Sequence, residues 1–148
     1  MYRCGLKIIV TLVVISISAF SKAGENLSSY QYSCKITGAA SGEMIDEVER
    51  SRVARQYIGK EFLVDLKSGR ISGTISNSLA DETLVNSYGE DGSSYQIVSI
   101  FRASAGVMPY VLSLEVSEQT KGEIKPFVLM RSTTVLFGKC SHRVIGKT

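Results

Sequence analysis

The sequence predicts a mainly β protein, a single antiparallel barrel or sandwich of about eight short strands with one short helix. Three observations support this fold class. Apolar and polar residues alternate in many short segments, as in strands that bury one face. Turns that contain glycine separate these segments, and no strand–helix–strand rhythm is visible. Two cysteines fall on the first and the last predicted strand, where a disulfide would staple a small exported domain.

The N-terminus has the three parts of a secretory signal peptide. Arg3 and Lys7 make it basic, Ile8–Phe20 is an apolar run, and Ser21–Ala23 is a cleavage motif of the small-x-small kind. An uncleaved membrane anchor is the alternative, but these 13 apolar residues fall short of the roughly 20 that span a bilayer. We therefore expect cleavage after Ala23 and a periplasmic or secreted protein without a stable membrane anchor.

Cleavage would divide the chain into a signal peptide, residues 1–23, and one mature domain, residues 24–148. The whole chain has 17 lysines and arginines against 14 aspartates and glutamates. Three basic residues, Arg3, Lys7 and Lys22, leave with the signal, so the mature domain carries 14 residues of each sign. A nucleic-acid-binding surface needs a net basic domain or a basic stripe, and this balance argues against one.

The cysteines predict one structural disulfide. Cys4 leaves with the signal, whereas Cys34 and Cys140 stay in the mature domain. In an exported protein this pair is expected to be oxidised, closing a loop of about 106 residues. Chain-entropy models give such a loop roughly 4–5 kcal/mol of stabilisation. A disulfide between the first and the last strand would also suit the closure of a barrel, which removes exposed strand edges. A reactive thiol pair is the alternative, but it favours a Cys-x-x-Cys spacing that this chain lacks.

The mature domain begins with a predicted strand and the one predicted helix. Tyr30–Ile36 alternates cleanly and carries Cys34 on its apolar face. Thr37–Gly42 is rich in small residues and is predicted to be a turn or loop. Asp46–Ile58 is the helical candidate, because Asp46 can cap its first turn.

The clearest supersecondary signal is an antiparallel hairpin in Phe62–Gly73. Phe62, Val64 and Leu66 form one face of its first strand, and Gly69 is free to take the positive φ of the turn.

The rest of the chain predicts further short strands separated by turns, followed by a tail at His142–Thr148. The segment Ser93–Arg102 is apolar on both faces, which is typical of a central strand or of one covered by the helix. The other expected strands are Thr83–Tyr88, Tyr110–Ser117, Ile124–Arg131 and Thr133–Cys140.

The sequence predicts no enzyme, no metal site and no cofactor. His142 is the only histidine, and its predicted place in the tail does not suit a catalytic triad. One histidine and two oxidised cysteines do not make a zinc site. No glycine-rich phosphate loop followed by Lys-Ser/Thr is present.

One turn is a candidate binding site, because it gathers acids, hydroxyls and an aromatic ring on a rigid β scaffold. The alternative is a solubilising hairpin turn whose tyrosine packs inward. The candidate residues are Glu90, Asp91, Ser93, Ser94 and Tyr95.

Several motifs resemble those of a group of small exported bacterial proteins without an assigned activity: Tyr32–Cys34, Gly59–Asp65, Lys125–Phe127 and Gly138–Cys140. This resemblance implies a bacterial envelope setting. The segment Asp91–Tyr95 is also similar to the Ser-Gly-x-x-Tyr loop of periplasmic inhibitors of C-type lysozyme, with Asp91 in place of the serine.

These observations predict a non-enzymatic, periplasmic or secreted binding protein, whose partner is a protein or a small apolar ligand. The first alternative is an inhibitor of a cationic hydrolase such as C-type lysozyme, to which Glu90 and Asp91 would supply complementary charge. The others are a carrier whose barrel interior holds a small apolar ligand and an envelope assembly component that donates or accepts a strand edge.

Overall fold

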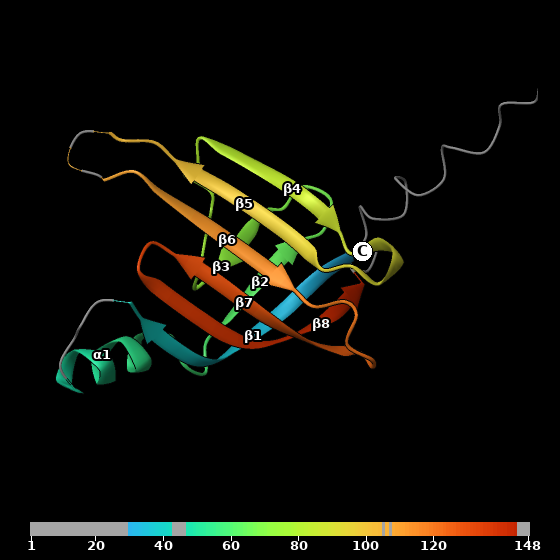
Figure 1. Ribbon diagram of the computed structural model, residues 1–148, viewed down its shortest axis with the longest axis horizontal. Coiled ribbons are helices and arrows are strands. Elements are labelled where there is room, and N and C mark those ends of the chain that lie inside the picture. The colour runs from blue at the N-terminus through green and yellow to red at the C-terminus, as the bar shows by residue number, and fades with distance from the viewer. Residues whose placement is uncertain (1–29, 43–46, 105, 107, 145–148) are drawn as a thin grey trace, which may run out of the picture.

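The computed structural model describes residues 30–42, 47–104, 106 and 108–144, except for the side chains of Glu49 and Asp91. In this part of the chain, eight antiparallel strands form one sheet that curls into a half-barrel, and one α-helix lies beside it (Figure 1). The predicted mainly β fold is therefore confirmed. The expected signal peptide, its cleavage site and the helix-capping Asp46 lie outside the described residues. No helix within the described ranges is long and apolar enough to cross a membrane.

The order of the strands in the sheet is β3-β2-β1-β8-β7-β6-β5-β4, so the first and last strands of the chain are neighbours in its middle. The two edges are β3 and β4. The elements are β1 (Tyr30–Ser41), α1 (Glu47–Tyr57), β2 (Glu61–Asp65), β3 (Ile71–Gly73), β4 (Glu82–Tyr88), the short 3-10 helix η2 (Glu90–Gly92), β5 (Tyr95–Phe101), β6 (Tyr110–Val116), β7 (Ile124–Arg131) and β8 (Thr134–Val144).

Each predicted strand is present, but two segments that were expected to be irregular belong to strands. Thr37–Gly42 was expected to be a turn or loop, yet β1 continues through Ser41; β8 likewise continues through His142 to Val144. The two extensions belong to one long ladder, in which Tyr30 pairs with Val144 and Ser41 pairs with Thr134. Pairing between segments far apart in the chain supplies backbone hydrogen bonds that the local propensity of small residues does not predict.

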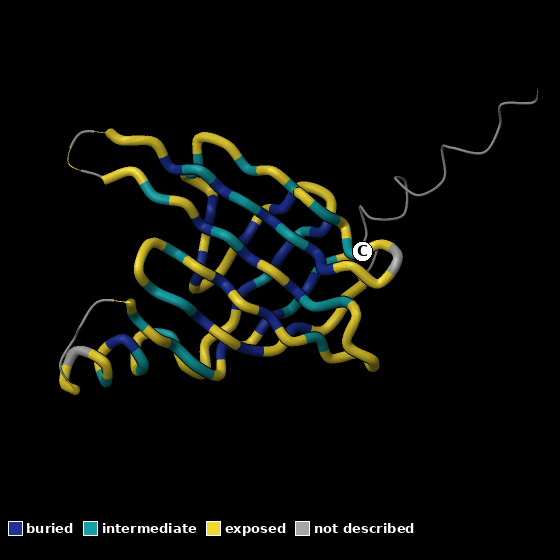
Figure 2. The backbone as a smooth tube through the Cα atoms, in the orientation of Figure 1, coloured by how far each residue is buried: buried dark blue, intermediate teal, exposed yellow. Residues whose placement is uncertain are grey.

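The concave side of the half-barrel holds a single core (Figure 2). Buried residues of β1, β2, β5, β6 and β7 alternate with half-buried or exposed ones, as the period of two requires. The rings of Phe62 and Phe127 meet edge to face, with their centroids 5.2 Å apart. The largest fully buried side chains are Tyr32, Tyr95, Phe62, Ile36, Ile71, Ile75, Ile97, Leu112, Leu114, Leu129, Leu136 and Val64.

The predicted disulfide joins Cys34 to Cys140, which are directly opposite each other on β1 and β8. One expectation about it was wrong. The bond was expected to suit the closure of a barrel, but it lies between neighbouring strands in the middle of the sheet, and the sheet stays open between β3 and β4.

Side chains bridge this open side, where the hairpin β2–β3 folds back over β4 and β5. The carboxamide of Asn77 accepts a hydrogen bond from the Ile71 amide at 2.7 Å. It donates to the Gly69 carbonyl and to the Ser99 hydroxyl, both at 2.9 Å. Thr83 and Ser99 also share a hydrogen bond at 3.1 Å. We call Asn77, Thr83 and Ser99 the polar seam.

Candidate functional site

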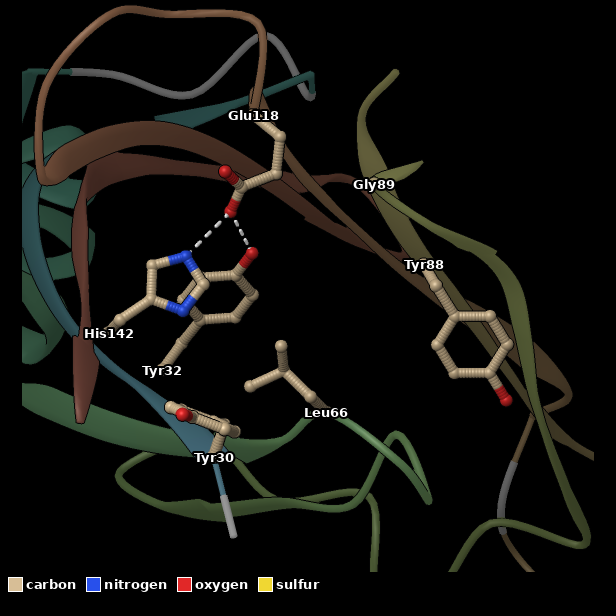
Figure 3. A pocket seen from close by; sticks show the side chains of 7 residues that line it. All are labelled: Tyr30, Tyr32, Leu66, Tyr88, Gly89, Glu118 and His142. Carbon is tan, nitrogen blue, oxygen red and sulfur yellow. Dashed lines mark hydrogen bonds and ion pairs between the residues drawn. The ribbon is translucent and has the colours of Figure 1, made fainter. Parts of the chain in front are cut away.

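A pocket of about 330 Å³ opens at the end of the half-barrel where β1 begins and β4 ends (Figure 3). The core behind the pocket is packed, so the pocket is an opening at the surface and not a cavity inside the half-barrel. We call it the tyrosine pocket. It is lined by Tyr30, Tyr32, Leu66, Tyr88, Gly89, Glu118 and His142.

Strands on both sides of the opening supply the tyrosines. Tyr30 and Tyr32 come from the start of β1, where Tyr32 is buried and Tyr30 is 39% exposed. Tyr88 is the last residue of β4 and is 42% exposed. In Figure 3 Tyr88 lies across the gap from the other side chains, with its hydroxyl directed away from them and Leu66 in between.

Gly89 allows the turn after β4 to approach Glu118. Its φ of 74° lies in the left-handed region, which favours glycine. A Cβ atom at this position would also lie 2.7 Å from Cγ of Glu118. A larger residue at position 89 would therefore displace the Glu118 side chain from the pocket wall.

Glu118 is the centre of the polar wall. It follows β6, and its side chain is only 15% exposed. Oε1 accepts a hydrogen bond from the Tyr32 hydroxyl and lies 3.1 Å from Nε2 of His142. Oε2 lies 3.3 Å from Nζ of Lys125. We call Glu118, Tyr32, His142 and Lys125 the Glu118 cluster.

Lys125 fixes the connection that carries Glu118. Its ammonium group donates to the backbone carbonyls of Glu118 at 2.9 Å and of Thr120 at 2.7 Å. Its side chain is 12% exposed. The lysine thus holds both the carboxylate and the backbone of Glu118, which limits the positions that this carboxylate can take.

The electrostatics keep Glu118 ionised and Tyr32 neutral. Burial by itself would raise the pKa of Glu118, but the hydrogen bonds from Tyr32 and Lys125, with the nearby charges of His142 and Lys125, outweigh it and lower that pKa. Burial, followed by the hydrogen bond to the Glu118 carboxylate, raises the pKa of Tyr32. Tyr32 therefore serves as a hydrogen-bond donor and not as a nucleophile.

A second pocket, of about 440 Å³, lies on the other side of Glu118 and His142. We call it the polar pocket. Its lining adds Gly122, Glu123, Lys125 and Ser141 to those two residues. Lys125 lines this pocket and is absent from the lining of the tyrosine pocket.

The predicted binding turn is separate from the tyrosine pocket. Glu90 and Ser93 are exposed, and the Ser93 hydroxyl donates to the Glu90 carbonyl at 2.8 Å. Ser94 is buried and donates to Glu115 at 2.8 Å. Tyr95 is fully buried, and its hydroxyl donates to the Leu66 carbonyl at 3.0 Å. The ring of Tyr95 therefore packs inward, and Ser94 is also withdrawn from the surface.

The Asp91 side chain lies outside the described residues, so the turn as a site remains a prediction.

The sequence interpretation missed the Glu118 cluster. His142 was expected in a tail, but it pairs with Tyr32 across β8 and β1, and the two rings are 4.7 Å apart. A signal was available: Tyr32 precedes Cys34 by two residues and His142 follows Cys140 by two. In an antiparallel pair joined at the cysteines, these positions must be opposite. Glu118 and Lys125 gave no comparable signal.

The tyrosine pocket and the polar pocket share Glu118 and His142 but differ in their other lining residues, and Ser141 and Lys125 line only the polar pocket. A carboxylate beside an imidazole can orient a general base, but no serine, threonine, cysteine or lysine is among the residues that line the tyrosine pocket. Within the described ranges, no three or more His, Cys, Asp or Glu side chains gather as a metal site. Comparisons with protein-family models, curated proteins and solved structures find no match to this chain.

Proposed function

We propose that this chain is a non-enzymatic, exported binding protein that captures a small, mainly apolar ligand in the tyrosine pocket. The observation that carries the proposal is an aromatic pocket whose inner wall is fixed by the scaffold. Aromatic side chains with a few fixed polar groups are typical of small-molecule sites.

The inner wall is preorganised. Tyr32 is held by its hydrogen bond to Glu118 and by an edge-to-face contact with Tyr95, with the ring centroids 5.4 Å apart. Leu66 is 4% exposed and accepts the Tyr95 hydrogen bond through its carbonyl. A site that is already ordered loses less entropy when it binds a ligand.

The outer rim is free to contact a ligand. Among the described residues, the hydroxyls of Tyr30 and Tyr88 have no hydrogen-bond partner. Both side chains are partly exposed, and each presents a ring and a polar tip. They can therefore cover an apolar group and hydrogen-bond to its polar end.

Two further observations bear on the setting and the alternatives. The cystine suits an oxidising compartment, in line with the expected signal peptide. The burial of Tyr95 weighs against the lysozyme-inhibitor alternative, in which that ring would enter a cleft. The seven-residue edge strand β4, which pairs only with β5 among the described strands, favours the assembly alternative as a second candidate.

A titration of isotope-labelled protein with indole, p-cresol and cyclohexanol, followed by NMR, tests the proposal. We expect saturable shifts of the Tyr30, Leu66 and Tyr88 signals, and loss of binding in Tyr88→Ala. Leu84→Ala is the matched control, because Leu84 is a half-exposed residue of the same strand outside the pocket. Shifts that do not saturate, or that centre elsewhere, would refute the proposal.

A further inference from the structure

Resting on the proposed function, we infer that the ligand of the tyrosine pocket is a cation, an alkylammonium group with apolar substituents. The inference follows from the charges and rings that face the pocket. Among the seven residues that line it, Glu118 carries the one permanent formal charge, and His142 adds a positive charge only when protonated.

The positive partner of Glu118 is placed away from the tyrosine pocket. Lys125 reaches Oε2 of the carboxylate, whereas Tyr32 and His142 reach Oε1. Its ammonium group is occupied by two backbone carbonyls besides the carboxylate. A ligand in the tyrosine pocket therefore approaches the carboxylate from the side that has no lysine.

The tyrosine rings add to the negative potential of the pocket. The face of an aromatic ring attracts a cation within about 6 Å of its centroid. Tyr30 and Tyr88 bring two partly exposed rings to the opening. The buried ring of Tyr32, which packs against Tyr95 and His142, forms the inner wall of the pocket. An anionic ligand would meet the Glu118 carboxylate and these ring faces unfavourably, whereas a methylated ammonium group would satisfy both the charge and the apolar walls.

Lys125 limits how much more tightly the pocket should bind a cation than a neutral molecule. It lies 3.3 Å from Oε2 and partly compensates the charge of Glu118. A cation–π contact at a partly exposed ring is weaker than one that is fully desolvated, and Tyr30 and Tyr88 are both partly exposed. We therefore expect a cation to bind about tenfold more tightly than a neutral molecule of the same shape.

Choline and its neutral carbon isostere, 3,3-dimethylbutan-1-ol, make the decisive pair of probes. NMR titrations should give a dissociation constant for choline about tenfold below that for the alcohol. Glu118→Gln should remove most of this preference. Tyr88→Leu should weaken choline binding, and Tyr88→Phe should restore it relative to leucine because it keeps the ring. Leu84→Ala should behave like the wild type.

The outcomes separate the two proposals. Equal affinities, or tighter binding of the alcohol, would overturn the cation inference and leave the apolar-ligand proposal standing. Failure of choline, the alcohol and the aromatic probes to bind would overturn both. If Glu118→Gln does not fold, the comparison of Tyr88→Leu with Tyr88→Phe still decides. Phosphatidylcholine vesicles test the source of the ammonium group: co-sedimentation with them would point to a lipid headgroup, and binding of free choline alone to a small molecule.

Discussion

Two groups of polar side chains join distant parts of the half-barrel, and they differ in charge and in access to solvent. The polar seam consists of an amide and two hydroxyls, and two of its three members, Asn77 and Ser99, are buried. The Glu118 cluster contains a carboxylate, a lysine and a histidine, and it opens into two pockets. The seam holds distant parts of the sheet together, whereas the cluster presents charge to solvent.

The energetics of the two groups explain this division. Neutral hydrogen bonds in a buried site contribute about 1 kcal/mol each, and orphaned partners cost about 1–3 kcal/mol. The Glu118–Lys125 ion pair is mostly buried, so the cost of desolvating the two charges offsets much of their attraction. We therefore expect the seam to matter for stability and the Glu118 cluster to matter for binding.

The largest expected effect is that of Asn77→Ala. It orphans the Ile71 amide and the Gly69 carbonyl where the open side of the sheet is bridged, so the free energy of unfolding should fall by about 3 kcal/mol. Urea denaturation measures this change. Ser76→Ala is the control, because Ser76 is exposed and bonds only within its own turn; it should stay within about 0.5 kcal/mol of the wild type.

Binding of the apolar probes should survive in Asn77→Ala at low temperature, because the residue does not line the tyrosine pocket. A stability equal to that of Ser76→Ala would mean that the seam is not what holds the open side together.

The seam and the cluster also show what sequence reasoning can reach. The strands were predictable because alternation and turns are local patterns, as in Phe62–Gly73. The role of Asn77 could not be predicted. A polar residue between two strands is typical of a loop, and only the three-dimensional contact with Ser99 on β5 shows that it bonds across the open side. Tyr32 was correctly expected on the inner face of its strand, and the cystine could have placed His142 opposite it. Glu118 and Lys125 depend on the curl of the sheet, which no local pattern encodes.

Two tyrosine hydroxyls offer an intermediate and well-matched contrast. Tyr95→Phe removes a hydrogen bond to the Leu66 carbonyl, and Tyr32→Phe removes one to the Glu118 carboxylate. Both rings stay buried, so Tyr95→Phe should lose about 1 kcal/mol of stability and Tyr32→Phe about 2 kcal/mol, because its hydrogen bond is to a charged group; thermal unfolding measures both.

Only Tyr32→Phe should alter the pKa of Glu118, because Tyr95 makes no hydrogen bond to that carboxylate. Without the hydroxyl, the pKa of Glu118 should rise, because one of the groups that lowers it is gone. An NMR titration of the Glu118 carboxyl carbon measures this pKa. An upward shift in Tyr95→Phe as large as that in Tyr32→Phe would contradict the separation between the tyrosine that bonds to the backbone and the one that bonds to the cluster.

The smallest expected effect is the pH dependence that Glu118 gives to folding. Burial raises its pKa, but the hydrogen bonds from Tyr32 and Lys125 and the charges of His142 and Lys125 lower it by more. The pKa of Glu118 in the folded protein therefore lies below the ordinary value of 4.5. The unfolded chain then binds this proton more readily than the folded protein. The contribution of Glu118 to stability is fully present above the unfolded pKa and is lost as the pH falls through the folded pKa.

Urea denaturation at about pH 6 and about pH 3.5 should show this difference. The wild type should lose more stability on acidification than Glu118→Gln, in which no proton can bind at this position. Asn77→Ala should follow the wild type, because the seam contains no group that titrates in this range. If the wild type and Glu118→Gln instead lost equal stability on acidification, the hydrogen bonds and charges around Glu118 would stabilise the ionised carboxylate no more than water does. The pKa of Glu118 would then be the same in the folded and the unfolded chain. In that case the partners in the Glu118 cluster would not favour its charged form, and the proposed electrostatic difference between the seam and the cluster would be wrong.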